Sequence, residues 1–253
     1  IGATDEDYLD LLGEPDADPS GTASAGTVWV VSGDDGTVLN QIHGTANYQQ
    51  FGRAIACLQD IDGDGDNEII VGDKDYEAHG VNIGRLVVLD AMTGTVLREI
   101  KGTTPTPNFG IEVADLGDLD GDGIHDVGNI GVINDISASF VEAYSGADGS
   151  PIWRNYQLTG TFNLVSVGDA NGDDVPELVC ASPGYLGFPG SGSVHDGATG
   201  ARLQGLGGST PGSFLSIAGP GDTNGDGQPE LLAGTAPSSF GSGVVRADLL
   251  TMP

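Results

Sequence analysis

The chain has 253 residues, with 37 aspartates and glutamates against 8 lysines and arginines, and its formal net charge is −29. This charge excludes nucleic acid as a natural partner, because phosphate binding needs clustered basic side chains. No stretch reaches the roughly 20 apolar residues of a membrane helix, so we expect no membrane insertion. With 43 glycines and 13 prolines, the composition favours many short strands joined by tight turns.

The N-terminal stretch opens with a short acidic segment, Asp5-Glu-Asp-Tyr-Leu-Asp10, which is followed by LLGEP. An apolar strand, a turn that ends at Gly36 and a second strand, TVLNQI, come next. We expect this first unit to be incomplete, because no strand led by a phenylalanine precedes its acidic segment.

A longer acidic segment then recurs four times, at residues 60–68, 118–126, 169–177 and 222–230, with starts 58, 51 and 53 residues apart. Ahead of each copy stands a phenylalanine: Phe51, Phe109, Phe162 and Phe214. Behind each copy comes a short apolar run, then an alternating strand. In the units before the last, a turn closing on Gly94, Gly149 or Gly200 and a further strand complete the pattern. Features kept in one order at a fixed period indicate a repeat architecture.

Each unit is predicted to form four antiparallel strands, which cannot bury both faces unless neighbouring units stack around an axis. The predicted fold is therefore all-β: a single β-propeller domain over 1–253, with about five four-stranded blades and calcium loops between strands. The predicted units are 1–50, 51–108, 109–161, 162–213 and 214–253, of which the first and last are incomplete. A β-solenoid is the alternative, although its repeats are usually shorter. The ring could close by joining the two partial units, through neighbouring molecules or through further chain.

The acidic segments have the residue types of a calcium loop. Acidic or amide side chains at positions 1, 3 and 5 supply oxygens, position 7 supplies its backbone carbonyl, and an acid at position 9 completes the shell. Hard oxygen ligands in a flexible cage suit Ca²⁺ better than Mg²⁺ or Zn²⁺. The predicted ligand residues are Asp60, Asp62, Asp64, Asp66, Glu68, Asp118, Asp120, Asp122, Ile124, Asp126, Asp169, Asn171, Asp173, Val175, Glu177, Asp222, Asn224, Asp226, Gln228 and Glu230.

These segments are not EF-hands, because an EF-hand needs glutamate at position 12, where this chain has Val71, Asn129, Cys180 and Ala233. Simple solvated Asp-Gly turns are the other interpretation. Four copies in phase, each closed by an acid at position 9, favour metal binding over that interpretation. A fifth site near Asp5, Asp7 and Asp10 is left open, since that segment lacks the glycines.

The units resemble FG-GAP repeats, the blades of the integrin-α-type β-propeller, which is also common in secreted bacterial proteins. Phe51-Gly52 and Phe109-Gly110 match the first half of the motif, whereas Phe162-Asn163 and Phe214-Leu215 depart from it. Approximate second halves are found at Gly13–Pro15, Ala181–Pro183 and Gly234–Pro237. The resemblance implies a calcium-binding propeller. Propellers of this family often have seven blades, so about five leave the closure of the ring open.

No catalytic or cofactor-binding residue is predicted. The four histidines are scattered, and neither a nucleophile motif nor a zinc motif is present. His125, at position 8 of its loop, is expected to face water. Cys57 and Cys180, which lie in separate apolar runs, are expected to be buried thiols, and Trp29 and Trp153 to be core residues.

These observations predict a non-catalytic extracellular module, secreted or at the cell surface, that serves a structural, adhesion or protein-interaction role. Self-assembly through exposed edge strands is an additional hypothesis. The alternative is a carbohydrate-binding, lectin-like propeller, or the propeller part of a polysaccharide-degrading enzyme. With only 15 aromatic residues in the chain and no tryptophan in the acidic loops, a glycan partner ranks second.

Overall fold

The structure, a computed structural model, describes residues 9–14, 25–46, 49–102, 109–133, 138–157, 163–182, 191–207, 212–237 and 246–251. All regular secondary structure within these ranges is β-strand. None of the described residues forms a helix that could cross a membrane.

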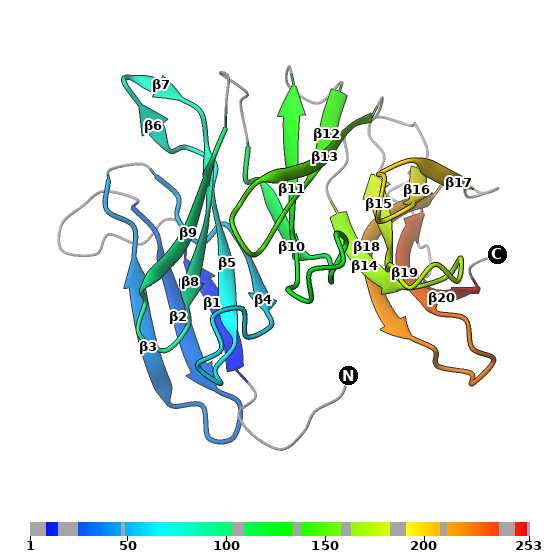
Figure 1. The fold of residues 1–253 in the computed structure, drawn as a ribbon, viewed down its shortest axis with the longest axis horizontal. Helices are drawn as coiled ribbons and strands as arrows, with labels where there is room; N and C mark the ends of the chain where they lie inside the picture. The colour runs from blue at the N-terminus through cyan, green and yellow to red at the C-terminus, as the bar shows by residue number, and fades with distance from the viewer. Residues whose placement is uncertain are drawn as a thin grey trace.

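Five antiparallel sheets follow one another along the chain (Figure 1). Sheet I contains β1 (Leu9–Glu14), β2 (Thr27–Ser32) and β3 (Val38–His43). Sheet II contains β4 (Ala54–Leu58), β5 (Glu68–Asp73), β8 (Arg85–Asp90) and β9 (Val96–Lys101). Sheet III contains β10 (Glu112–Asp115), β11 (Val127–Ile133), β12 (Ala138–Tyr144) and β13 (Pro151–Gln157). Sheet IV contains β14 (Asn163–Gly168), β15 (Glu177–Ser182), β16 (Ser191–His195) and β17 (Arg202–Gly207). Sheet V contains β18 (Gly212–Gly221), β19 (Glu230–Pro237) and β20 (Arg246–Thr251).

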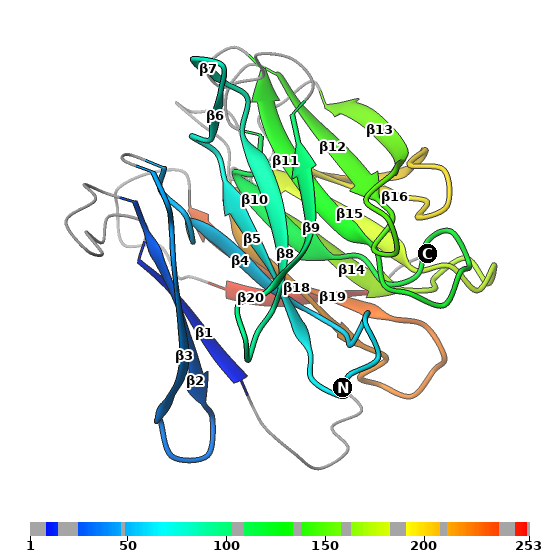
Figure 2. The same ribbon diagram turned by 60° about the vertical axis from the view of Figure 1, so that its left-hand side comes forward.

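The predicted all-β architecture is confirmed, with four-stranded sheets in the middle and three-stranded sheets at both ends of the described chain. The sequence did not predict a short hairpin between β5 and β8, formed by β6 (Glu77–Ala78) and β7 (Val81–Asn82). Both views place this hairpin beyond the end of sheet II (Figures 1 and 2).

The first strands of consecutive sheets pack against one another, in the order β4, β10, β14 and β18, and β1 lies next to β4. The sheets therefore stand side by side, and within each sheet the second strand lies next to the first (Figure 1). This arrangement brings the same connector of every repeat to the same end of the molecule.

Apolar cores separate consecutive sheets, and β5 shows how one strand serves two of them. Ile69 and Val71 pack with Val28 in the core between sheets I and II. Ile70 packs with Val127 in the core between sheets II and III. Because alternate residues of a strand point to opposite faces, a strand covered on both faces reads as an unbroken apolar run.

The phenylalanines ahead of the first two long acidic segments fill the core with the preceding sheet. Phe51 lies between sheets I and II, and Phe109 lies between sheets II and III, where its ring meets the Tyr144 ring edge-on with 6.2 Å between centroids. Phe162 lies outside the described residues, and Phe214 belongs to β18.

The predicted glycine turns join the outer two strands of sheets I to IV. In sheet II, the Asp90 N–H donates to the Thr95 carbonyl at 3.0 Å, and the Gly94 N–H donates to the Asp90 carbonyl at 2.9 Å. The same pair of bonds recurs in the other three sheets. Each turn glycine has a positive φ, between 70° and 77°, which side chains disfavour.

Two expectations about single side chains need correction. Cys180 is buried as predicted, but Cys57 is exposed, because its side of the short first strand is not covered. Trp29 and Trp153 are half-buried rather than fully enclosed. Trp153 packs against the core between sheets III and IV, and its Nε1–H donates to the Gly197 carbonyl at 2.7 Å.

Candidate metal centres

Each of the four long acidic segments connects the first strand of a sheet to its second strand. The segment 60–68 belongs to sheet II, 118–126 to sheet III, 169–177 to sheet IV and 222–230 to sheet V. We call these connectors loops A, B, C and D. All four loops emerge at the same end of their sheets, since each leads from the first strand into the second.

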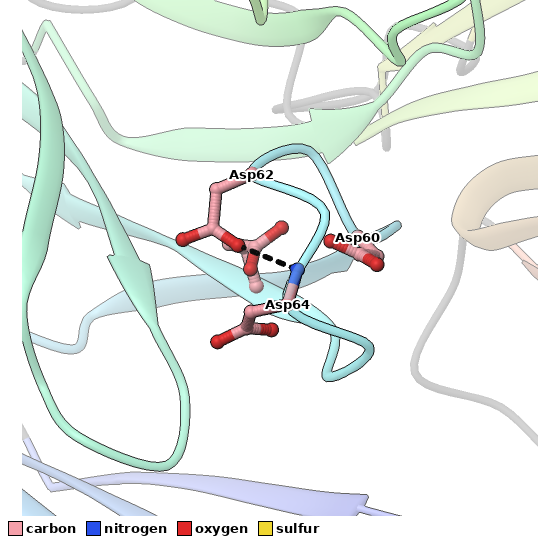
Figure 3. A group of neighbouring side chains, drawn as sticks. Asp60, Asp62 and Asp64 are labelled. Atoms are coloured by element: carbon pink, nitrogen blue, oxygen red, sulfur yellow. Dashed lines mark hydrogen bonds between the residues drawn. The ribbon is translucent and has the colours of Figure 1, made fainter.

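The loops gather predicted ligands into four groups, in each of which the candidate oxygens lie within 4.8 Å of one another. The groups are Asp60, Asp62, Asp64 and Glu68 in loop A; Asp118, Asp120 and Asp122 in loop B; Asp169, Asp173 and Glu177 in loop C; and Asp222, Asp226 and Glu230 in loop D. Figure 3 shows the three aspartates of loop A carried on one tight turn.

The aspartate at position 1 anchors the turn. Asp60 Oδ1 accepts the Gly63 N–H at 2.6 Å, and Asp60 Oδ2 accepts the Gly65 N–H at 3.0 Å. The same two bonds, from positions 4 and 6, recur in loops B, C and D. Both carboxylate oxygens are thereby held toward the inside of the loop.

The next predicted ligands accept hydrogen bonds from the backbone N–H two residues further along the chain. In loop A, Asp62 Oδ1 accepts the Asp64 N–H at 3.1 Å, which is the bond drawn in Figure 3. Asp64 Oδ1 in turn accepts the Asp66 N–H at 2.9 Å. The bond from position 7 to position 5 is present in all four loops. In loop C, the second oxygen of the position-5 aspartate also has a partner, because Asp173 Oδ2 accepts a bond from Asn171 Nδ2 at 3.1 Å.

Positions 4 and 6 need a backbone with positive φ. Gly63 and Gly65 have φ of 82° and 100°, and the corresponding residues of the other loops also lie in this region. Position 6 of loop C is Asp174, with a φ of 68°. Aspartate is one of the few residues that tolerate this conformation, which explains the departure from glycine.

Loops C and D carry asparagine at position 3. The Asn171 Nδ2 donates to Glu177 Oε1 at 2.7 Å, and the Asn224 Nδ2 donates to Glu230 Oε1 at 2.8 Å. The amide thus sits beside the closing glutamate in both loops. Presenting its oxygen to a cation would require the amide group to turn over.

The closing acid at position 9 is buried in every loop, with 1% or less of its surface exposed. Its carboxylate accepts the N–H of position 2, as in the bond from Ile61 to Glu68 Oε2 at 2.6 Å. The equivalent bond joins Leu119 to Asp126, Ala170 to Glu177 and Thr223 to Glu230. The closing acid therefore holds the start of the loop against its end.

Glu68 gives the direct test of whether loop A fits a cation. Its Oε1 is buried and has no hydrogen-bond partner. Burial raises the pKa of Glu68 to about 7, and the charges of Asp62 and Asp60 add to the rise. A buried, unpartnered carboxylate oxygen beside other carboxylates costs free energy unless a cation neutralises it. The donor set of loop A fits a hard divalent cation.

Loop B differs at its closing residue. Asp126 accepts the Leu119 N–H at 2.7 Å and the Gly146 N–H at 3.0 Å, one on each oxygen, and it lies outside the group formed by the other three aspartates. Burial raises its pKa to about 6. His125 does not face open water as expected, because it is half-buried and contacts Asp115 at 2.9 Å.

The remaining predicted ligands are the position-7 residues of the four loops and the residues of the fifth site. The position-7 residues, Asp66, Ile124, Val175 and Gln228, donate their N–H groups to position 5, and coordination by their carbonyls stays a prediction. Asp10 belongs to β1, and Asp5 and Asp7 lie outside the described residues, so the fifth site stays open.

One buried acidic group has no counterpart in the sequence prediction. Asp73, at the far end of β5 from loop A, accepts hydrogen bonds from Gln49 and from Arg85, the latter at 2.7 Å. Its Oδ1 is buried without a partner, and burial raises its pKa to about 6. Arg85 also lies over the Tyr76 ring, 4.2 Å from its centroid. No sequence pattern marks this cluster, because its members come from separate segments.

Comparison with known proteins finds similarity to integrin alpha chains. No family model matches the chain. Human integrin alpha-8 is 24% identical over 188 residues, which cover 66% of this chain and 18% of that protein. Integrin alpha-5 of Xenopus laevis is 26% identical over 212 residues, covering 72% of this chain and 19% of that protein. The chain therefore spans about a fifth of the length of these relatives, and the predicted resemblance is confirmed.

A solved structure described as the Dos1 propeller matches with a TM-score of 0.50 at 11% sequence identity, covering 88% of this chain and 53% of that chain. At this identity the likeness concerns the fold alone. Together with the five consecutive sheets, it identifies the fold as a β-propeller.

Proposed function

We propose that this integrin-α-like propeller is a non-catalytic, calcium-binding module that acts outside the cell in adhesion or another protein interaction. The proposal rests above all on one observation, the recurrence of the same hydrogen-bonded acidic loop in four consecutive sheets. We further propose that 1–253 is one propeller domain, to which each of the five predicted units contributes one sheet.

Calcium is the cation that best suits the donors. Carboxylate, amide and backbone oxygens are hard ligands, and a loop of about nine residues is flexible enough for six to eight of them. Zinc would require histidine or cysteine, and neither occurs among the predicted ligands. Four Ca²⁺ ions would bring eight positive charges to a chain with a formal net charge of −29.

A bound ion would neutralise the carboxylates that the loop holds together. In loop A, Asp60, Asp62, Asp64 and Glu68 would hold it, and Glu68 Oε1 would gain the partner that it lacks. Without a cation, the mutual repulsion of the carboxylates destabilises the loop. An ion that binds only the folded loop stabilises the fold by mass action.

The extracellular and interaction roles are supported by the similarity to integrin α chains. Calcium is abundant outside cells, where loops of moderate affinity are filled. The histidines of the chain form no acid–base arrangement in the sequence, which supports a non-catalytic role. Self-assembly through the two end sheets is part of this proposal.

The first experiment measures calcium binding and its effect on unfolding. We expect about four calcium ions per chain in isothermal titration calorimetry. At a 100-fold excess over Kd, each site contributes about 2.7 kcal/mol, so excess chelator should lower the Tm by roughly 5 to 10 °C for each site that is emptied. A Tm that is unchanged by the chelator would contradict the proposal.

A matched pair of variants in loop A tests the assignment of ligands. Asp64→Asn removes a predicted side-chain ligand but keeps the oxygen that accepts the Asp66 N–H. Asp66→Asn removes the same charge from a residue that is predicted to coordinate through its backbone. We expect Asp64→Asn to reduce the number of bound ions by one and Asp66→Asn to leave that number unchanged.

A further inference from the structure

Loops A, B and C each touch the sheet that follows them. The side chain at position 2 packs into the core shared with the next sheet: Ile61 between sheets II and III, Leu119 between sheets III and IV, and Ala170 between sheets IV and V. The N–H of the same residue is bonded to the closing acid of its loop. The ligand set is therefore tied directly to an inter-sheet core.

Loops C and D also touch the sheet that precedes them. Pro176, at position 8 of loop C, sits over Gly117, where a Cβ would lie 2.8 Å from the proline Cγ. Pro229, at position 8 of loop D, sits over Gly168, where a Cβ would lie 3.5 Å from the proline Cβ. Both glycines have positive φ, 76° and 94°. A side chain at Gly117 would clash with the Pro176 ring, whereas the Pro229 ring lies at ordinary van der Waals distance from the place where a Cβ of Gly168 would be.

Because these glycines directly precede the neighbouring loops, the proline contacts connect one loop to the next. Gly117 directly precedes Asp118, the first ligand of loop B, and Gly168 directly precedes Asp169, the first ligand of loop C. Each proline thus rests on the residue that leads into the neighbouring loop. Loop D contacts the entry to loop C, and loop C contacts the entry to loop B.

A second contact ties loops B and C together. Gly197, which follows β16 in sheet IV, lies so close to both loops that a Cβ would come within 2.0 Å of the Pro176 carbonyl oxygen and 3.0 Å of Leu119 Cδ2. Leu119 is 3% exposed, so this junction is closely packed. Closely packed interfaces transmit a displacement rather than absorb it.

We propose that loops B, C and D bind their cations cooperatively, with Pro176 and Pro229 as the positioning residues that couple neighbouring sites. An ion that orders one loop fixes its proline against the entry of the preceding loop, and so reduces the conformational entropy that the next ion must remove. The coupling is reciprocal, because each site must affect the other by the same factor. This inference rests on the proposed function.

The experiment follows single loops by NMR. In ¹⁵N-labelled protein, the amide signals of Gly123 and Gly227, at position 6 of loops B and D, report calcium binding at each loop. The paired substitution Asp169→Asn and Asp173→Asn removes the site in loop C. We expect it to weaken calcium binding at loops B and D about 5-fold or more, which is the lower end of usual coupling between sites. The signal of Gly65 in loop A should titrate as in the parent.

The proline variants then test the route of coupling. Pro176→Ala and Pro229→Ala keep every ligand, so all loops should still bind calcium, but the Hill coefficient of the isotherm should fall toward 1. Asn67→Ala is the matched control, because Asn67 occupies position 8 of loop A and is exposed. It should leave the Hill coefficient unchanged.

The outcomes separate the two proposals. Absence of calcium binding at every loop of the parent protein overturns the proposed function. If the parent binds calcium but the affinities of loops B and D do not change when the site in loop C is removed, only the cooperative coupling is overturned. The loop C substitutions leave both prolines in place, so the result at loops B and D does not depend on how the proline variants fold.

Discussion

At the scale of single residues, hydrogen bonds from backbone N–H groups shape the loops. The turn bonds accepted by Asp60, Asp62 and Asp64 fix the orientation of their carboxylates in loop A. Glu68 is the exception, since its Oε1 lacks a partner in a buried position. The cost of an empty loop A is therefore concentrated at this residue.

Glu68 predicts how pH affects the calcium-free protein. Its pKa is raised to about 7 in the folded state from an ordinary 4.5, so the folded state retains a proton that the unfolded chain releases. The raised pKa of Glu68 contributes on the order of 2 to 3 kcal/mol to the free energy of unfolding. This contribution is complete below about pH 4.5 and is lost as the pH rises toward 7. In chelator, the free energy of unfolding should fall over this range.

Comparing the parent with Glu68→Gln isolates the contribution of Glu68 to the pH dependence of stability. Asp73 and Glu112, whose pKa values burial raises to about 6 and about 7, give a pH dependence of the same sign in parent and variant alike. Denaturant unfolding at pH 5 and pH 7.5 should show a smaller difference for Glu68→Gln than for the parent. An identical pH dependence in the two proteins would contradict the assignment.

At the scale of elements, glycines set how closely loops and sheets approach. Gly117 meets the Pro176 ring of the next sheet, whereas Gly36, in the outer turn of sheet I, has no heavy atom within 4 Å of the place where a Cβ would be. The two have nearly the same φ, 76° and 75°. They form a matched pair for separating backbone strain from a clash between sheets.

We expect Gly117→Ala to be more destabilising than Gly36→Ala. Gly36→Ala should cost about 1 kcal/mol, because a side chain disfavours the left-handed conformation. Gly117→Ala adds an overpacked contact, which costs a further 1 to 3 kcal/mol or so. Chemical denaturation of both variants in chelator measures the difference without any contribution from bound calcium. Equal losses would show that the contact between Gly117 and Pro176 is easily relieved.

At the scale of the whole molecule, the apolar cores join sheets I to II, II to III, III to IV and IV to V, so sheets I and V end the series among the residues that the structure describes. The outer faces of sheets I and V are more exposed than the equivalent faces of the inner sheets. Leu232 of sheet V is 39% exposed, whereas its register equivalents Ile70 and Val179 are fully buried by the next sheet. Val31 of sheet I is half-buried, whereas its equivalent Leu89 is 2% exposed.

These two faces correspond in register to surfaces that the inner sheets bury against each other. In two copies of the chain, sheet V of one copy can pack on sheet I of the other, as consecutive sheets pack within one copy. A head-to-tail contact of this kind does not need to close, so it would build larger assemblies. This geometry supports self-assembly by packing of sheet faces, whereas the pairing of edge strands expected from the sequence stays a prediction.

Sedimentation velocity over a range of concentrations tests this contact in the presence of calcium. The parent should form species larger than the monomer, and Leu232→Glu should abolish them, because a charge on the contact face opposes burial. Val96→Glu is the control, since Val96 is 56% exposed on the outermost strand of sheet II. A parent that remains monomeric throughout would refute head-to-tail association.

Much of this molecule could be predicted from local sequence. Strand order, incomplete end sheets, glycine turns and acidic loops all recur at a fixed period, and each depends on interactions within a few residues. The bonds that Asp60 and its counterparts accept join residues at most five positions apart. Such short-range contacts form the same way in every repeat, so a repeated pattern implies a repeated structure.

What the sequence left undecided depends on residues that are distant along the chain. The buried cluster of Asp73 with Gln49 and Arg85, and the contact of Pro176 with Gly117, exist only because separate segments pack together. Burial of Glu68 and exposure of Cys57 likewise depend on which side of a strand the neighbouring sheet covers. The sequence alone determined the repeat, its strands and its acidic loops, because those follow from local chemistry. Only the tertiary structure decided which carboxylates lose water and which loops touch, because both result from packing between sheets.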